Sequence, residues 1–242
     1  MDKLQKELRG IAKDQGVDLF EVADLTVAHD FVVAQGGELI GHFPRAVSLG
    51  VRLLDAVVDE LSRHEDPSAI YAYRGLYNTV NTSLDRAALS VAKGIQEAGF
   101  KAYPIPSSQR IDSRKLQGIF SHKLAAHLAG LGWIGKSCLL ITPDYGPRVR
   151  LASVLTDAPM ESGIPLSVRC GECRRCVDVC PVKAFTGVPF NPSESRDVRF
   201  QAHLCDEYSD RRKQLLGEGI CGLCVHICPY GATRKNRSRG TD

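Results

Sequence analysis

Cysteines are the residues of this chain whose type and spacing are best suited to chemistry. The 242-residue sequence contains nine, and eight of them follow residue 169. The first run, CGECRRCVDVCP, has the spacing C-x2-C-x2-C-x3-C-P and contains Cys170, Cys173, Cys176 and Cys180. In a reducing compartment, thiols at such density ligate metal more readily than they form disulfides. The sequence therefore predicts a thiolate metal centre after residue 169.

A second run supplies the remaining ligands of two iron–sulfur clusters. The first spacing is that of bacterial two-cluster ferredoxins, in which the fourth cysteine binds the other cluster. The later stretch ICGLCVHICPYG repeats only C-x2-C-x3-C-P, with Glu218 in the place of the missing cysteine, and Cys205 completes the count. We predict two [4Fe–4S] clusters, one held by Cys170, Cys173, Cys176 and Cys228 and the other by Cys180, Cys205, Cys221 and Cys224.

The alternative for these eight cysteines is structural zinc. Zinc sites made of four cysteines come as two separated C-x2-C pairs, so the triplet followed by x3-C-P favours the clusters. The ninth cysteine, Cys138, is interpreted as a buried small hydrophobic residue. His226 lies between cluster ligands and is a candidate to tune a cluster through a hydrogen bond. His122 is interpreted as structural, with catalysis as its alternative because it precedes the Gly-rich stretch.

A Gly-rich stretch, AGLGWIGKSCLL at residues 129–140, fits two nucleotide-binding motifs. Gly130 to Ser137 matches G-x-x-x-x-G-K-S, and Gly130, Gly132 and Gly135 match G-x-G-x-x-G. Both motifs need a strand before the loop and a helix after it. Here a helix-forming segment, SHKLAAHLA, comes first and a short apolar, strand-like run follows. This order argues against a nucleotide site.

The composition is that of a soluble globular protein, with 43% hydrophobic and 24% charged residues. A net charge of +3 gives no bulk electrostatic case for nucleic-acid binding. The N-terminal stretch MDKLQKELRGIAKDQG is expected to form an amphipathic helix and lacks the apolar core of a secretory signal. No apolar run approaches the ~20 residues of a membrane span. We therefore expect a cytoplasmic protein.

Both helices and strands are expected before the cysteine runs. We predict a buried strand at residues 44–53, a helix from about Leu76 to Ala98, and a short strand in FKAYPIP. The apolar face of that helix comprises Leu84, Ala87, Ala88, Val91, Ala92 and Ile95. A second helix, from about Arg114 to Ala129, leads into the Gly-rich stretch. The apolar runs LLITP and VRLASVLT follow, joined by DYGPR, which has hairpin-like turn chemistry.

Cysteine position divides the chain into three expected parts. Residues 1–162 form an α/β domain that binds a cofactor or substrate, and residues 163–233 form a ferredoxin-like domain with two [4Fe–4S] clusters. Residues 234–242 form a basic tail, for which we prefer a solvated end over a contact with RNA phosphates. A ferredoxin alone needs far fewer residues, so the first part is expected to hold the electron acceptor.

The motifs together resemble the epoxyqueuosine reductases and their wider relatives, which include reductive dehalogenases. The resemblance is strong over residues 124–230, and the motifs that carry it are LAGLGWIGKSCLLITPDYGPRVRLASVLTDAPM, CGECRRCVDVCP and CGLCVHICPYG. It implies an α+β fold, with a nitroreductase-like α/β N-terminal domain that binds cobalamin and a ferredoxin-like domain with two [4Fe–4S] clusters. The chain would be a short form without the family's C-terminal helical-repeat extension.

Single residues of this chain match the family's motifs. In that family the Gly-rich stretch lies beside the cofactor, which implies cofactor-binding roles for Gly130, Gly132, Trp133, Gly135 and Lys136. The family's Asp-Tyr-His segment matches Leu76-Tyr77-Asn78, so Tyr77 is the candidate catalytic proton donor, with packing on the core as its alternative. The family's acid before the Gly-rich stretch has no counterpart in GIFSHKLAA.

The resemblance implies an iron–sulfur oxidoreductase that passes electrons through two clusters to a corrinoid and a reducible substrate. In the namesake enzymes this is a tRNA-processing step of queuosine biosynthesis, so tRNA is a candidate substrate here. The implied electron donor is a protein such as a ferredoxin or flavodoxin, and no membrane is involved. One alternative is a ferredoxin-like electron-transfer protein with no cofactor in its first domain. The other is a protein that reduces a corrinoid bound to a partner.

Overall fold

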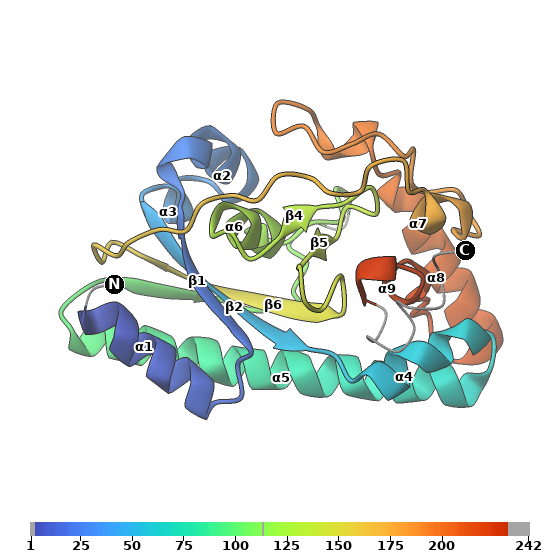
Figure 1. Cartoon of the computed structure of the whole chain (residues 1–242), viewed down its shortest axis with the longest axis horizontal. Helices are drawn as coiled ribbons and strands as arrows, with labels where there is room; N and C mark the ends of the chain where they lie inside the picture. Colours follow the sequence, from blue (N-terminus) through green and yellow to red (C-terminus); the bar gives the residue numbers. More distant parts are fainter. Residues whose placement is uncertain (1–2, 113, 232–242) are drawn as a thin grey trace. The chain divides into compact units, whose positions relative to one another are not determined.

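A computed structural model describes residues 3–112 and 114–231 and shows a mixed α and β fold (Figure 1). The α+β class predicted from the sequence is confirmed. The chain divides into two compact units. Unit 1 comprises Met1–Val51, Thr79–Gly132 and Arg150–Leu166, and unit 2 comprises Arg52–Asn78, Trp133–Val149 and Ser167–Asp242. These units alternate along the chain, whereas the predicted domains 1–162 and 163–233 are consecutive. The predicted basic tail, 234–242, lies outside the described residues.

A four-stranded sheet organises unit 1. Its strands are β1 (Leu19–Asp24), β2 (Arg45–Arg52), β3 (Ala102–Ile105) and β6 (Val149–Thr156), in the order β1-β2-β6-β3. β1 is antiparallel to β2, with Leu19 opposite Gly50, and β3 is antiparallel to β6, with Ala102 opposite Thr156. The strands predicted at 44–53 and in FKAYPIP are confirmed as β2 and β3. β2 is buried over consecutive residues, as a continuous apolar run in a central strand should be.

The longest helix of unit 1 packs its apolar face as predicted. The described helices of this unit are α1 (Lys3–Asp14), η1 (Thr26–Ala28), α2 (His29–Gly36), α3 (Glu38–Gly41), the second part of α5 (Pro67–Glu97) and α6 (His122–Leu128). α5 buries Leu84, Ala87, Ala88, Val91, Ala92 and Ile95. It begins earlier than predicted, because proline suits the first helical position and the Asp66 carboxylate accepts the Ser68 N–H at 2.8 Å. Among the described residues, no helix is long and apolar enough to cross a membrane.

The second predicted helix is shorter than expected. It was predicted from about Arg114, but α6 begins at His122. Asp112 accepts hydrogen bonds from the backbone N–H groups of Arg114 and Lys115 at 2.9 and 2.8 Å, which closes a turn. Ser121 then caps α6, accepting the Leu124 N–H on its Oγ at 3.3 Å. Side-chain capping therefore overrides helix propensity in this segment.

Unit 2 is built from short elements. They are α4 (Asp55–Asp59), η2 (Glu60–Arg63), β4 (Trp133–Ile134), β5 (Leu140–Ile141), α7 (Arg175–Asp178), η3 (Arg196–Val198), α8 (Ala202–Leu216), α9 (Leu223–His226) and η4 (Pro229–Gly231). α9 packs against α4, η2 and α7. The turn chemistry of DYGPR does not produce a hairpin between the two apolar runs. The first run forms β5, which pairs with β4, and the second forms β6 of the larger sheet.

Candidate iron–sulfur site

Four cysteines from two distant segments line one cavity in unit 2. The wall of this cavity contains Cys170, Cys173, Cys176 and Cys228, here called the first cysteine group. Cys173 is exposed and the other three are partly buried. Burial and the neighbouring thiols Cys170 and Cys173 raise the pKa of Cys176 to about 11, and burial likewise raises the pKa of Cys228 to about 11. The structure therefore gathers the set that the sequence assigned to one cluster.

The other four cysteines gather around a small apolar core of unit 2. Cys180 belongs to that core, and Cys205 and Cys224 pack against it. Burial, then the neighbouring thiols Cys221 and Cys205, raise the pKa of Cys224, and Cys180 adds to the raised pKa of Cys221. We call Cys180, Cys205, Cys221 and Cys224 the second cysteine group. The Cys176 thiol also acts on Cys224, so the two groups are neighbours.

The donor sets fit [4Fe–4S] clusters. Thiolates are the soft ligands that iron–sulfur clusters take, and each group supplies four. Among the described residues, no three His, Cys, Asp or Glu side chains converge as ligands of a single metal ion would. The ligands of a four-iron cluster bind separate irons, so their sulfurs stand around the cluster rather than around one ion. Cys138 is buried in the turn between β4 and β5, as predicted for a small hydrophobic residue.

The first glycine of the Gly-rich stretch ends a helix. Gly130 has a φ of +77°, and its N–H and that of Leu131 bond to the carbonyls of His127 and Ala126 at 3.0 and 2.9 Å. This is a Schellman motif, in which glycine takes the left-handed position without strain. The stretch then continues into the β4–β5 hairpin, so no helix opens on the loop. The predicted order of helix, loop and strand is confirmed, and neither nucleotide motif has its structural context.

The remainder of the Gly-rich stretch belongs to the cysteine cavity. Gly135 and Lys136 line that cavity, and a Cβ at position 135 would lie 3.4 Å from Cys170 Sγ and 2.8 Å from Ile141. Lys136 is 8% exposed, and its Nζ donates to the Gly171 carbonyl at 2.7 Å.

The other residues predicted to bind a corrinoid have described contacts within the chain. Trp133 is fully buried, with its ring edge-on to Tyr230 at 4.8 Å between centroids. The Gly132 carbonyl accepts from His127 Nδ1 at 3.1 Å. Together with Gly130, Gly135 and Lys136, these residues contact the cysteine cavity, its lining or the chain's own backbone. Cofactor binding by these five residues stays a prediction.

Glu218, in the place of the missing cysteine, anchors the loop that leads to Cys221. Its carboxylate forms an ion pair with Arg74 and accepts the backbone N–H groups of Gly219 and Ile220 at 2.7 and 3.2 Å. The Arg74 guanidinium holds the pKa of Glu218 below its ordinary value. Arg74 also lies over the ring of Tyr77, 5.6 Å from its centroid. Tyr77 is half-buried on α5 and is not among the residues that line the cysteine cavity.

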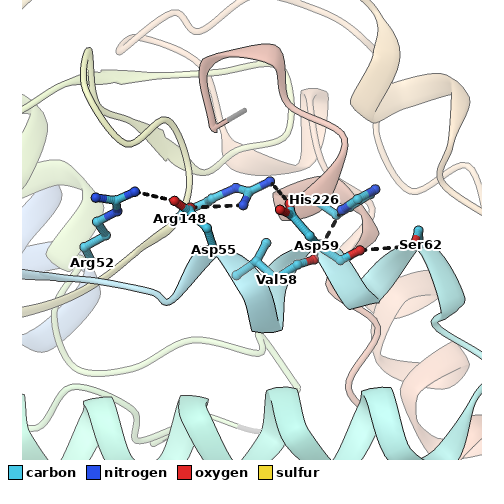
Figure 2. Close-up of polar contacts among 7 residues, drawn as sticks. All are labelled: Arg52, Asp55, Val58, Asp59, Ser62, Arg148 and His226. Carbon is cyan, nitrogen blue, oxygen red and sulfur yellow. Dashed lines mark hydrogen bonds and ion pairs between the residues drawn. The ribbon is translucent and has the colours of Figure 1, made fainter. Parts of the chain in front are cut away.

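A buried arginine, which sequence reasoning missed, holds α4 in place next to the cysteine-bearing α9. Arg148 is 2% exposed, and it pairs with Asp55 at 3.1 Å and Asp59 at 2.6 Å. Figure 2 shows both ion pairs as dashed lines. On the same helix α4, the Val58 carbonyl accepts from His226 Nδ1 at 3.2 Å. His226 thus bonds to the backbone of α4. No spacing in the sequence could reveal Arg148, because its partners lie 93 and 89 residues away.

Comparisons with known proteins support this site. Residues 169–231 match the family of the 4Fe-4S double cluster binding domain. An epoxyqueuosine reductase of Listeria monocytogenes is 33% identical over 131 residues, which cover 50% of this chain and 32% of the relative. A reductive dehalogenase structure that suggests a mechanism for B12-dependent dehalogenation has a TM-score of 0.69 at 17% identity, covering 94% of this chain and 31% of that one. An epoxyqueuosine reductase with a tRNA stem loop has a TM-score of 0.57 at 18% identity, covering 95% and 65%.

Fold and site together define an iron–sulfur protein with a double [4Fe–4S] cluster binding domain in the C-terminal part of the chain. The resemblance to the epoxyqueuosine reductase-like iron–sulfur proteins, predicted from the motifs, is confirmed. The two structural likenesses show the fold alone. The chain spans about a third of the length of the curated relatives it matches.

Proposed function

We propose that this protein is an iron–sulfur oxidoreductase whose two [4Fe–4S] clusters are held by the first and second cysteine groups. The observation that carries the proposal is the cysteine cavity. Cys228, from the second run, lines it together with three cysteines of the first run. Cys180, from the first run, lies instead with the cysteines of the second. This exchange of one ligand between runs is the arrangement of two-cluster ferredoxins.

The proposed electron path begins outside the protein and passes through both clusters. Cys173 is exposed, so a cluster on the first cysteine group would have one ligand at the surface. A cluster with a ligand at the surface can exchange electrons with a donor protein such as a ferredoxin or flavodoxin. Cys176 and Cys224 belong to different groups and are close enough for their thiols to interact. An electron would therefore pass between clusters within unit 2.

The acceptor that the resemblance favours is a corrinoid, because the similar reductive dehalogenase is described as B12-dependent. A bound corrinoid supplies a cobalt centre that accepts electrons. The five predicted corrinoid residues have described contacts with the cysteine cavity, its lining or the chain's own backbone, and this observation supports a second candidate function, electron transfer without a cofactor in the N-terminal part. By the same resemblance tRNA is a candidate substrate, since a similar epoxyqueuosine reductase is seen with a tRNA stem loop.

The cluster assignment is tested by the Cys205→Ala substitution. After anaerobic reconstitution, the wild-type protein should hold about eight irons and the variant about half of that, because one cluster loses a ligand. Iron analysis and EPR of the reduced protein measure this. Cys138→Ala is the matched control and should keep the wild-type iron content. Full iron in Cys205→Ala would contradict the ligand partition, and bound zinc without an iron–sulfur EPR signal would contradict the clusters.

The acceptor is tested by adding cob(II)alamin to the reconstituted protein and recording the cobalt EPR signal. A changed signal, with cobalt comigrating on gel filtration, supports the corrinoid-dependent oxidoreductase. A signal identical to that of free cobalamin, beside intact cluster signals, supports the electron-transfer protein.

A further inference from the structure

Two buried cations of unit 2 lie beside the cysteine groups, one beside each. Lys136 is 8% exposed and donates to the carbonyl of Gly171, the residue after Cys170, at 2.7 Å. Arg212 is 3% exposed and donates to the carbonyl of Ile220, the residue before Cys221, at 3.3 Å. Arg212 also bonds to the His64 carbonyl. Each cation is thus tied to the backbone next to a cysteine.

Neither cation has a carboxylate partner within the described part of the chain, where their polar partners are backbone carbonyls. Arg148, another of the buried cations of unit 2, pairs with two aspartates. A buried charge is costly unless an opposite charge compensates it. An anion beside Lys136 and another beside Arg212 would therefore compensate these buried charges.

The cysteine groups are where such anions would lie. Lys136 lines the same cavity as the first cysteine group. The charge of Arg212 acts on the Cys221 thiol of the second group, where it opposes the larger effect of burial on the pKa. A [4Fe–4S] cluster with four thiolate ligands is an anion in both of its usual oxidation states. Each cluster would thus be the counter-charge of one buried cation.

We propose that Lys136 and Arg212 are the counter-cations of the two clusters and raise their reduction potentials, Lys136 for the first cysteine group and Arg212 for the second. The inference rests on the proposed function, because it needs the clusters. Reduction of [4Fe–4S]2+ to [4Fe–4S]1+ takes one electron from the donor and makes the cluster with its thiolates one charge more negative. A fixed positive charge nearby favours that reduced form. Burial keeps solvent ions from screening the effect.

The test is an EPR-monitored redox titration of the reconstituted protein. Lys136→Gln removes the charge but keeps an N–H donor for the Gly171 carbonyl. It should lower one midpoint by about 59 mV, a tenfold change in the equilibrium constant of a one-electron reduction, and leave the other midpoint unchanged. Arg212→Gln should lower the other midpoint by a similar amount, whereas Arg212→Lys, which keeps the charge, should preserve it.

Lys183→Gln is the matched control. Lys183 lies three residues after Cys180 in the sequence and is exposed. Its Nζ donates to the Asp178 carbonyl at 3.0 Å. This substitution removes the same charge near a cysteine from a position that solvent screens. Both midpoint potentials should stay close to their wild-type values. The equilibrium constant of reduction of either cluster should change by no more than about twofold.

Iron analysis before each titration separates the two proposals. Absence of clusters from the wild-type protein would contradict the proposed function. Wild-type iron content with unchanged midpoints in Lys136→Gln and Arg212→Gln would overturn the inference alone. A single substitution that lowers both midpoints equally would overturn the one-to-one assignment. If Lys136→Gln fails to load iron, Lys136→Met, which avoids burying a polar amide, should show the same single shift.

Discussion

At the residue scale, His122 shows how burial settles the role of a titratable side chain. Its Nε2 donates to the Pro106 carbonyl at 3.0 Å, which leaves Nδ1 to accept from Ser153 Oγ at 2.9 Å. Burial lowers the pKa of His122 to about 4, although the Pro106 carbonyl acts in the opposite direction. The ring is therefore neutral at pH 7 and its two nitrogens are occupied by the protein. These contacts favour the structural interpretation over catalysis.

We predict that His122 makes the protein less stable in mild acid. The folded pKa of about 4 lies below the ordinary value of 6.5, so only the unfolded state binds a proton between them. The contribution is complete above about pH 6.5 and is lost as pH falls toward 4, by about 3 kcal/mol. His122→Gln cannot titrate, so its unfolding midpoint should depend less on pH in this window. Thermal unfolding of both proteins from pH 7.5 to 4.5 measures the difference, and parallel profiles would contradict the prediction.

At the scale of elements, α4 shows how a buried ion pair can fix a short helix. Asp55 and Asp59 lie one turn apart on α4, and both reach the guanidinium of Arg148 (Figure 2). α4 has only five residues, too few to be stable by itself, so tertiary contacts must hold it. The same helix receives the hydrogen bond of His226, which lies between Cys224 and Cys228 on the cysteine-bearing segment. By holding α4, Arg148 therefore also helps to position the segment that carries Cys224 and Cys228.

We predict a large loss of stability for Arg148→Met. The substitution leaves two carboxylates without their partner, which costs about 3 kcal/mol and corresponds to a drop of about 6–12 °C in Tm. Arg52→Met is the control, because Arg52 also pairs with Asp55 but its side chain is 45% exposed. It should lower Tm by no more than about 3 °C. Thermal unfolding at one scan rate measures the Tm of both variants. Equal Tm shifts would contradict the prediction that the buried ion pair contributes more to stability than the exposed one.

At the scale of the whole molecule, the compact units do not coincide with consecutive stretches of chain. Unit 2 includes residues 52–78 and 133–149 in addition to the cysteine runs. α4 and the β4–β5 hairpin therefore belong to the unit that would fold around the clusters. Metal binding contributes to folding free energy when the site does not exist in the unfolded chain. The stability of these early segments should consequently depend on iron.

Hydrogen exchange before and after iron chelation tests this dependence. We expect faster amide exchange after chelation in residues 167–231 and also in 55–63 and 133–141, because all belong to unit 2. Exchange in β1 and in the unit 1 part of α5 should stay unchanged and serves as the internal control. An increase confined to residues 167–231 would instead favour the consecutive division at residue 162.

The sequence determined those features that depend on local spacing. The apolar period of α5 places Leu84, Val91 and Ile95 in the core. The cysteine spacings, with Cys205 as the remaining ligand, lead to the same two groups that the structure gathers. Such features can be predicted from sequence because a helix face or a ligand loop is defined within a few turns of chain. The assignment of the cysteines to two clusters stays a prediction.

Tertiary structure decided what depends on distant segments. The Gly-rich stretch shows this at Lys136: the order of helix, loop and strand follows from the sequence, whereas the position of Lys136 on the wall of the cysteine cavity depends on the distant segment that carries Cys170. The partners of Arg148 lie 93 and 89 residues away in the sequence, so no local spacing predicts them. Whether a charge is paired with a carboxylate or left to face a cluster depends on which segments bury it. The packing of the whole unit therefore determines which charges need a partner, because an unpaired charge is costly only where water is excluded.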